Sequence, residues 1–514
     1  MPGSACQRGP GLALSVVPRA WRQAPACGGG DPRASPRRPS PAFCTTAAAA
    51  WLLLLLAPPS PGAAAAGGRG PTGGAAAGAA VHPASRRQLL GRGPPKTAYD
   101  YTSMAGRARG ARAGGRPDPV RGLTTPDVSA AGPKTATMED QVLGHGYPLE
   151  TYPVETSDGF ILRVYRIPHG KKNSTGAGPK PVVLLHHGIT LDSSSFVLLD
   201  PDSSMGFYLA DAGFDVWMAN ARGNTFSRGH RHHRTTDEAY WQWSMDEPAL
   251  IDLPAQIDFI LRRTGQRSLA VAGHSQGVTL PLMLMAARPE YNSKIWLFLL
   301  MGGVSQSSDV KGAFLRQQVD TGSLTVLSGI GAGAFMPNHV TTQLISNCTK
   351  RRDMKWCLAF INFLFYGDSK VIHTEDFTRV ASTWPSILST RNIQHWTQTI
   401  TRGTGVAMFD FGTACPGPNP KPYCETCNQA RYGQDTPPGY DMSKVTTKAL
   451  VLHGADDIVA TAVSRDALLA SWGARVVGNK EYPGAVHMDF VWARRPVMKD
   501  DIIAGLWAHA PPPW

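Results

Sequence analysis

Large apolar side chains and acidic side chains are both scarce in the first 137 residues of this 514-residue chain. This part consists mainly of glycine, alanine, proline and arginine, and holds 17 basic but only 4 acidic residues. Such a composition buries too little apolar surface to offset the chain entropy that folding removes. We therefore expect residues 67–137 to be a disordered basic segment.

The rest of the chain lacks an excess of charge of either sign. Of the 51 basic and 38 acidic residues in the whole sequence, 34 of each lie in residues 138–514, so the net charge of +13 comes from the amino-terminal part. A nucleic-acid-binding domain would carry its positive charge on the folded part. We expect no nucleic-acid partner, and we interpret the basic excess as a solvated tail or a targeting sequence.

The apolar run at residues 47–57 is too short to span a bilayer comfortably. Its length suits the apolar core of a signal peptide, with arginines before it and small residues at 62–67 for cleavage. A leader over residues 1–66 is expected, with entry into the secretory pathway as a secreted, lysosomal or vacuolar protein. Glycosylation sequons at Asn173 and Asn347 agree with that route. The long stretch before the run leaves a membrane anchor or an organelle-targeting leader as alternatives.

No set of metal ligands with a standard spacing is complete. Cys424 and Cys427 form a C-x-x-C pair, but no second pair of ligands follows at the spacing of a zinc site. His230, His232 and His233 form an H-x-H-H run in an arginine-rich loop, which matches no standard ligand pattern. We therefore expect no metal site.

A strand, a sharp turn and a helix follow one another directly over residues 268–288. Residues 268–272 are small and branched apolar side chains, residues 273–277 read GHSQG, and a helical pattern follows. Glycines are expected in so tight a turn because larger side chains would clash, and the turn places Ser275 above the sheet edge at the positive end of the helix. Pro281 is expected to kink this helix or to limit it to a short first turn.

A serine nucleophile needs a base and a group that orients the base. A second strand-like run, KALVL at residues 448–452, is followed by Asp456 and Asp457. We expect Asp457 to be the orienting acid, with Asp456 as the alternative. His487, in a loop before a helical stretch at residues 490–506, is the candidate base, because the acid and then the histidine follow the serine in such folds.

An α/β fold is indicated by strand-like runs that alternate with helical segments. About 145 residues separate the run at 295–301 from the one at 448–452, and a crossover needs only about a dozen. We therefore expect an inserted cap at about residues 305–445. The other expected strands cover residues 149–154, 160–167, 181–186 and 214–219.

The sequence resembles the acid lipase family of α/β-hydrolases, which includes the gastric and lysosomal lipases and plant, fungal and algal relatives. The similarity runs from about Gln141 to Leu506, and many blocks occur in one order. They include GYPLETYPVETSDGFIL (146–162), LLHHG (184–188), LADAGFDVWMANARGNTFSR (209–228), YWQWSMDEPALIDLPAQIDFI (240–260), GHSQG (273–277), HWTQ (395–398) and HMDFVWA (487–493).

The resemblance implies the site residues as well as an α/β-hydrolase fold for residues 138–510. It places the nucleophile on Ser275, the acid on Asp457 and the base on His487. It also implies that the backbone N–H groups of Ile189 and Gln276 form the oxyanion hole, where each donor can contribute about 3 kcal/mol to transition-state stabilisation.

The implied function is hydrolysis of carboxylic esters of neutral lipids, either acylglycerols or sterol esters, through an acyl-enzyme and without a cofactor. In the family a cap roofs the active site and lines an acyl-chain pocket, and an exposed apolar cap face would bind a lipid-droplet or membrane surface. Two alternatives stay open. One is an esterase of the same fold that acts on non-glyceride esters, and the other is a non-catalytic lipid-binding protein.

The cysteines of the folded part fall into two groups. Cys348 and Cys357 lie in the expected cap, where the resemblance implies a disulfide. Cys415, Cys424 and Cys427 lie in a loop rich in glycine and proline. There we expect one local disulfide that leaves one thiol, with the pairing open.

Overall fold

The computed structural model covers most of the chain from Thr137 onwards. The leader, the basic segment, the sequons at Asn173 and Asn347 and the Cys348–Cys357 pair lie outside the described residues. These are residues 137–171, 178–304, 309–312, 316, 319–320, 333–335, 367, 369, 372, 376, 379–380, 383–415 and 426–512.

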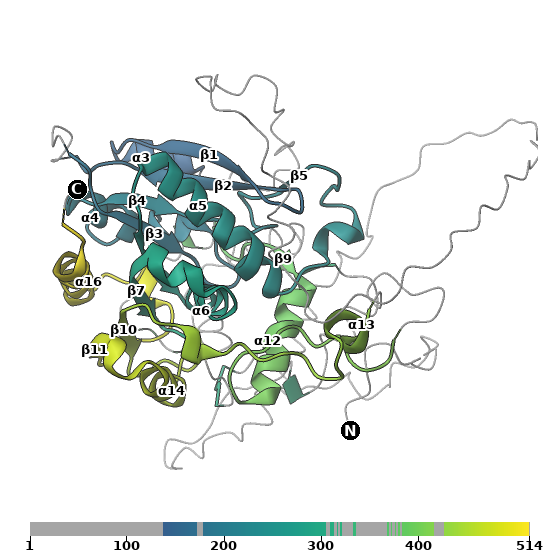
Figure 1. The fold of residues 1–514 in the computed structure, drawn as a ribbon. Helices are drawn as coiled ribbons and strands as arrows, with labels where there is room; N and C mark the ends of the chain where they lie inside the picture. Colours follow the sequence, from purple (N-terminus) through teal and green to yellow (C-terminus); the bar gives the residue numbers. More distant parts are fainter. Residues whose placement is uncertain are drawn as a thin grey trace, which may run out of the picture.

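A nine-stranded, mostly parallel sheet forms the centre of the molecule (Figure 1). Its strands lie in the order β1-β2-β4-β3-β6-β7-β10-β11, and the short β5 pairs with β2. β2 is antiparallel to β1, β4 and β5, whereas every pair from β4 to β11 is parallel. The strands are β1 (Glu150–Glu155), β2 (Phe160–Ile167), β3 (Val182–His186), β4 (Asp215–Met218), β5 (Gly229–His230), β6 (Leu269–His274), β7 (Ile295–Met301), β10 (Ala449–Gly454) and β11 (Val476–Tyr482).

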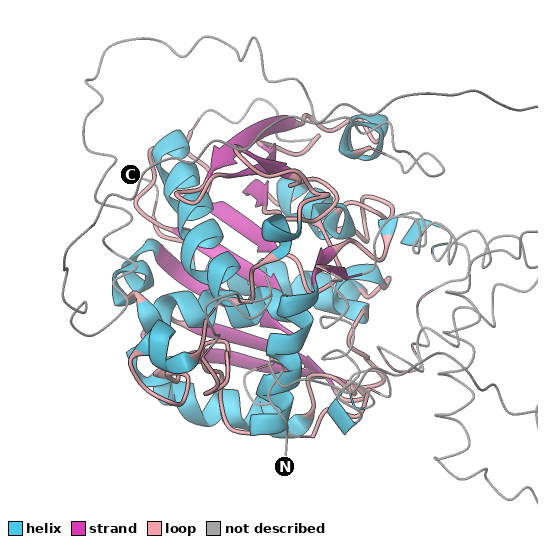
Figure 2. Ribbon diagram, turned by 90° about the vertical axis from the view of Figure 1, so that its right-hand side faces the viewer, coloured by secondary structure: helices cyan, strands magenta, loops and turns pink. Residues whose placement is uncertain are grey.

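Helices cover the sheet (Figure 2). They are α3 (Met138–Gly144), α4 (Met205–Asp211), α5 (Leu253–Thr264), α6 (Gln276–Ala287), α14 (Ala462–Trp472), α15 (Asp489–Trp492) and α16 (Pro496–His509). A π-helical turn, η5 (Pro248–Asp252), leads into α5. Short 3-10 helices are η3 (Ser193–Phe196), η4 (Glu238–Trp241), η6 (Pro289–Lys294), η9 (Met442–Lys444) and η10 (Gly473–Arg475).

Two apolar cores lie on opposite faces of the sheet, because successive strand residues point to opposite sides. In β3, Val183 and Leu185 belong to one core, and Val182 and Leu184 belong to the other. The first core includes side chains of α3, α4 and α16, and the second includes side chains of α5, α6 and α14. Burial on both faces explains why β3, β6 and β10 are continuous runs of buried residues.

The α/β arrangement predicted from the sequence is confirmed, and each expected strand lies within two residues of its predicted bounds. Two expectations about helices hold only in part. α6 is not limited to a short first turn but continues through Pro281 to Ala287, and Pro281 costs it the bond that a proline N–H would have made; a kink at Pro281 stays a prediction. The stretch at 490–506 is two helices, because Pro496 starts α16 as a new helix.

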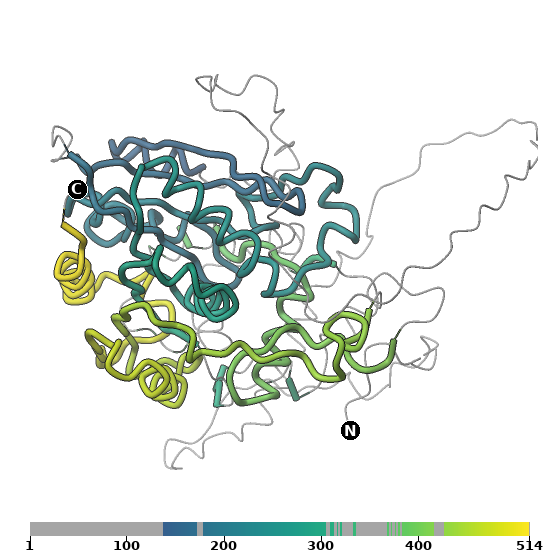
Figure 3. Tube along the Cα trace, viewed as in Figure 1, coloured from purple at the N-terminus to yellow at the C-terminus, as the bar shows by residue number. Residues whose placement is uncertain are grey.

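The chain between β7 and β10, which we term the inserted segment (residues 302–448), has its own elements. Its described part includes β8 (Ala334–Phe335), β9 (Leu388–Ser389), α12 (Thr390–Arg402) and α13 (Asn428–Tyr432), and β8 pairs antiparallel with β9. In Figure 3 its green portion runs beside the teal chain of α6. Across the described residues, no helix is both long and apolar enough to cross a membrane.

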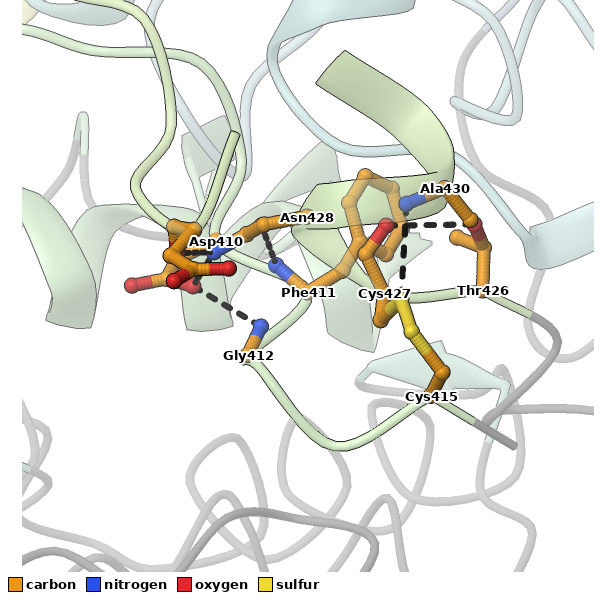
Figure 4. The surroundings of a disulfide bond; sticks show 9 residues. Asp410, Phe411, Gly412, Cys415, Thr426, Cys427, Asn428 and Ala430 are labelled. Atoms are coloured by element: carbon orange, nitrogen blue, oxygen red, sulfur yellow. Dashed lines mark hydrogen bonds between the residues drawn. A yellow bond between two sulfur atoms is a disulfide. The ribbon is translucent and has the colours of Figure 1, made fainter. Parts of the chain in front are cut away.

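A disulfide between Cys415 and Cys427 closes a loop of the inserted segment (Figure 4). Cys427 is also the residue that caps the amino terminus of α13, where its sulfur accepts from the Ala430 N–H at 3.4 Å. Next to it, the Asn428 amide donates to the Asp410 carboxylate at 2.7 Å. A local disulfide was expected, and the structure decides the pairing in favour of Cys415–Cys427; Cys424 lies outside the described residues.

Candidate active site

Ser275 lies at the carboxyl end of β6 in a strained turn. Its backbone angles are φ 55° and ψ −120°, a left-handed conformation that costs roughly 1–3 kcal/mol for a residue other than glycine. A Cβ atom on Gly273 would lie 2.1 Å from the Gly277 carbonyl oxygen, and one on Gly277 would lie 2.1 Å from the His186 carbonyl oxygen. The expected steric need for both glycines is therefore confirmed.

The structure distinguishes the two neighbouring acids after β10. Asp457 has a fully buried carboxylate, whereas Asp456 is exposed. Asp457 accepts the His487 Nδ1–H with its Oδ2 at 2.8 Å. Its Oδ1 accepts two backbone N–H groups, those of Val459 and Ala460, both at 2.8 Å. Every oxygen of this carboxylate is thus occupied, so the carboxylate holds the His487 ring in one orientation.

The loop after β7 brings the serine turn and the histidine together. The Ser275 N–H donates to the Met301 carbonyl at 3.0 Å. The next residue, Gly302, has φ 55°, and a Cβ atom there would lie 3.2 Å from His487 Nδ1 and 3.4 Å from Asp457 Oδ2. The His274 ring also donates its Nε2–H to the His487 carbonyl at 2.9 Å. These contacts place the hydrogen-bonded Asp457–His487 pair beside the turn that carries Ser275, at the carboxyl ends of β6, β7 and β10.

Two backbone N–H groups next to Ser275 are available as donors. Gln276 is the first residue of α6, so its N–H has no partner within the helix. Neither this N–H nor that of Ile189, in the loop after β3, donates to any of the described residues. That loop lies against the serine, because a Cβ atom on Gly188 would lie 3.0 Å from the Ser275 Cβ.

The arrangement fits acyl transfer. An imidazole that donates Nδ1–H to a buried carboxylate carries its lone pair on Nε2, the atom that can accept a proton from a serine hydroxyl. A serine at the amino terminus of a helix, beside N–H groups that donate to none of the described residues, suits a reaction in which negative charge develops on oxygen.

Three further histidines are buried around the site and stay neutral. Burial lowers the pKa of His186 to about 4 and that of His187 to about 3. For His274, burial and then the neighbouring His487 lower the pKa to about 3. His187 uses both ring nitrogens structurally, because Nδ1–H donates to the Gly188 carbonyl and Nε2 accepts the Ala221 N–H. These rings pack and form hydrogen bonds at the carboxyl ends of β3 and β6.

Replacing His186 should make the free energy of unfolding depend less on pH in the acidic range. The folded-state pKa of about 4 lies below the unfolded value of about 6.5, so between these pH values only the unfolded chain holds this proton. Stability is therefore lost as the pH falls through this range, and His186→Leu should reduce that slope by up to about 1.4 kcal/mol per pH unit. Urea unfolding at pH 4.5, 5.5 and 6.5 measures the slope, and parallel curves for both proteins would contradict the prediction.

The histidine run at residues 230–233 has a local role. The Nδ1 atom of His230 accepts the backbone N–H groups of His232 and His233 at 2.9 and 3.0 Å. Its ring packs edge-on against Phe160 at a centroid distance of 4.7 Å. Within the part of the chain that the structure describes, no group of three or more potential ligands is arranged to hold a metal ion.

A cavity of about 260 Å³ opens at the same edge of the sheet but beside the β1–β2 turn. Its wall includes Arg222, whose guanidinium is buried and bonds to Asp158 and Asp252. These ionic groups are paired with one another, so the cavity is a weaker candidate for chemistry than the Ser275 turn.

Sequence reasoning missed three residues that contact the site. His274 was noted only as part of the GHSQG motif, and Trp396 only as part of the HWTQ block. The Trp396 indole donates to the Gln276 side-chain oxygen at 2.6 Å, and the Trp384 indole donates to the Thr190 hydroxyl at 3.1 Å. No local pattern could have revealed these contacts, because each joins residues more than a hundred positions apart.

Comparisons with known proteins identify the family of this chain. The family described as "Partial alpha/beta-hydrolase lipase region" matches residues 139–200, and "alpha/beta hydrolase fold" matches residues 181–311. Gastric triacylglycerol lipase of Bos taurus is 33% identical over 71% of this chain and 89% of its own length. Lysosomal acid lipase/cholesteryl ester hydrolase of Homo sapiens is also 33% identical, over 71% of this chain and 89% of its own length. Human lipase member K is 33% identical over 70% of this chain and 88% of its own.

Proposed function

Because this chain belongs to the acid lipase family of α/β-hydrolases, we propose that it hydrolyses carboxylic esters of neutral lipids, acylglycerols or sterol esters, with Ser275 as nucleophile. The observation that carries the proposal is the 2.8 Å hydrogen bond from His487 to the buried carboxylate of Asp457, beside a serine in a strained turn. Relatives named as triacylglycerol lipase and as cholesteryl ester hydrolase support a neutral lipid as the substrate class.

The proposed reaction has two halves. His487, oriented by Asp457, accepts the Ser275 proton as the serine oxygen attacks the ester carbonyl, and the N–H groups of Ile189 and Gln276 stabilise the oxyanion. The protonated imidazole then gives its proton to the departing alcohol, which leaves an acyl-enzyme. A water molecule, activated by the same imidazole, releases the fatty acid.

We extend the proposal to the cap and to the cellular route. The inserted segment would act as a cap that binds the acyl chain and the lipid surface. The Cys415–Cys427 disulfide supports folding in an oxidising compartment, and hence the secretory pathway.

Two measurements test the function. A fluorophosphonate probe, which reacts with activated serines, should label Ser275 and no other residue; failure to label it would favour a non-catalytic lipid-binding protein. Initial rates on p-nitrophenyl butyrate and palmitate, and on emulsified trioleoylglycerol and cholesteryl oleate, should favour long chains in the emulsion. Preference for short, dissolved esters would indicate an esterase instead.

A further inference from the structure

The inserted segment makes a direct hydrogen bond to the residue after Ser275. The Nε1–H of Trp396, on α12, donates to Oε1 of Gln276 at 2.6 Å, and both side chains are buried. An indole N–H can only donate, so the amide oxygen of Gln276 must face Trp396. This bond ties the first residue of α6, whose backbone N–H is one of the two proposed oxyanion donors, to a helix outside the sheet domain.

The same segment also holds the loop of the other proposed donor. Thr190 follows Ile189 and has φ 58°, a costly conformation for a β-branched residue. Its hydroxyl accepts the Trp384 indole N–H at 3.1 Å, and its carbonyl accepts the Ser386 N–H at 2.7 Å. The Thr190 hydroxyl in turn donates to the Ile189 carbonyl at 2.7 Å. Hydrogen bonds from residues 384–386 thus stabilise the strained backbone conformation of this loop.

Other hydrogen bonds dock the segment independently of the two indoles. The Ser386 hydroxyl pairs with the Thr225 hydroxyl at 2.8 Å, and the Ser389 hydroxyl donates to the Trp241 carbonyl at 2.6 Å. His395 accepts the Met245 N–H at 3.2 Å. Losing one indole N–H should therefore leave the segment docked and change only the alignment of the loop that this N–H contacts.

We propose that Trp384 and Trp396 are positioning residues, which align the Ile189 and Gln276 N–H groups for the developing oxyanion. The proposal rests on the proposed ester hydrolysis and adds that turnover depends on contacts from the inserted segment. Oxyanion donors are effective only when aimed at the position that the oxygen takes in the transition state. A small displacement of these donors weakens transition-state stabilisation while leaving substrate binding almost unchanged.

Trp→Phe variants test this with a matched control. Trp396→Phe and Trp384→Phe remove one indole N–H each and keep an aromatic ring. Trp472→Phe is the control, because its indole is equally buried and donates to the Thr447 carbonyl at 2.7 Å, on α14 away from both loops. We expect each of the first two variants to lower kcat on p-nitrophenyl butyrate roughly tenfold with KM within about twofold. Trp472→Phe should keep the kcat of the parent protein.

A tetrahedral inhibitor and a double mutant separate positioning from general destabilisation. Butylboronic acid forms a tetrahedral adduct with an activated serine, so its inhibition constant should rise in Trp396→Phe by the same factor as kcat falls. Gln276→Leu removes the acceptor of the Trp396 bond but keeps the backbone N–H. Adding Trp396→Phe to Gln276→Leu should therefore cause little further loss of kcat.

The outcomes are distinct from those that test ester hydrolysis itself. A parent protein without turnover on any ester overturns both proposals. An active parent whose Trp396→Phe and Trp384→Phe variants keep its kcat, or lose no more than Trp472→Phe, overturns the positioning role alone. If Trp384→Phe does not fold, Thr190→Val removes the acceptor of the same bond, together with the bond to the Ile189 carbonyl, and should lower kcat at least as much. If Trp396→Phe does not fold, Gln276→Leu tests the hydrogen bond between Trp396 and Gln276 in its place.

Discussion

Ser275→Ala is expected to lower kcat on p-nitrophenyl esters by roughly 10⁵–10⁶-fold, because the acyl-enzyme cannot form without the hydroxyl. The change removes one oxygen atom and leaves the Gly273 and Gly277 contacts of the turn as they are. The melting temperature and the binding of a long-chain fatty acid should therefore stay close to those of the parent protein.

A serine outside the site provides the comparison. Ser293 is exposed, and its hydroxyl donates to the Glu290 carbonyl at 2.9 Å within η6. Ser293→Ala should leave turnover unchanged. Equal activity of Ser275→Ala and the parent protein would remove Ser275 from the mechanism.

Asp457→Asn should lower kcat by roughly 10⁴-fold, through the tautomer of His487. The oxygen of the new amide should keep the two N–H groups of Val459 and Ala460, which now bind Oδ1 at 2.8 Å. Its NH₂ group must then face His487 Nδ1, and two donors cannot share that position. The ring would respond by carrying its proton on Nε2, where it can no longer accept the proton of Ser275.

Asp456→Asn is the matched control for this change. The two carboxylates are neighbours in the sequence, but Asp456 is exposed and contributes its backbone N–H to the Ala485 carbonyl. Its amide variant should keep the kcat of the parent protein within about twofold, as surface changes usually do. Similar losses in both variants would show that charge near the loop, rather than the orientation of His487, controls the rate.

Patterns within short stretches predicted most of the sheet. The strands β3, β6, β7 and β10 are continuous apolar runs, because both of their faces are covered, and their bounds could be read to within two residues. β11 was missed, because it lies at the edge of the sheet and its residues are mostly exposed or half-buried, with no apolar period. Its polar sequence, VVGNKEY, resembles a loop.

Sequence alone also proposed Ser275, Asp457 and His487 as partners, from their order and from the elements that precede them. It did not include the contacts that surround them. Gly302, His274 and the Met301 carbonyl join the three loops, and none of them carries a motif that indicates this use.

What this chain's sequence determines alone is the local geometry: which runs form strands, and where glycines permit a sharp turn that lifts Ser275 out of β6. Side-chain periodicity and clashes within the turn indicate both from a few residues, although the need for glycine at 277 also comes from the His186 carbonyl on the neighbouring strand. The tertiary structure decides which of two adjacent carboxylates faces His487, which cysteine pairs with Cys427, and which indoles reach the loops after β3 and β6. These outcomes depend on hydrogen bonds between residues that only the packing of the whole sheet and of the inserted segment brings into contact.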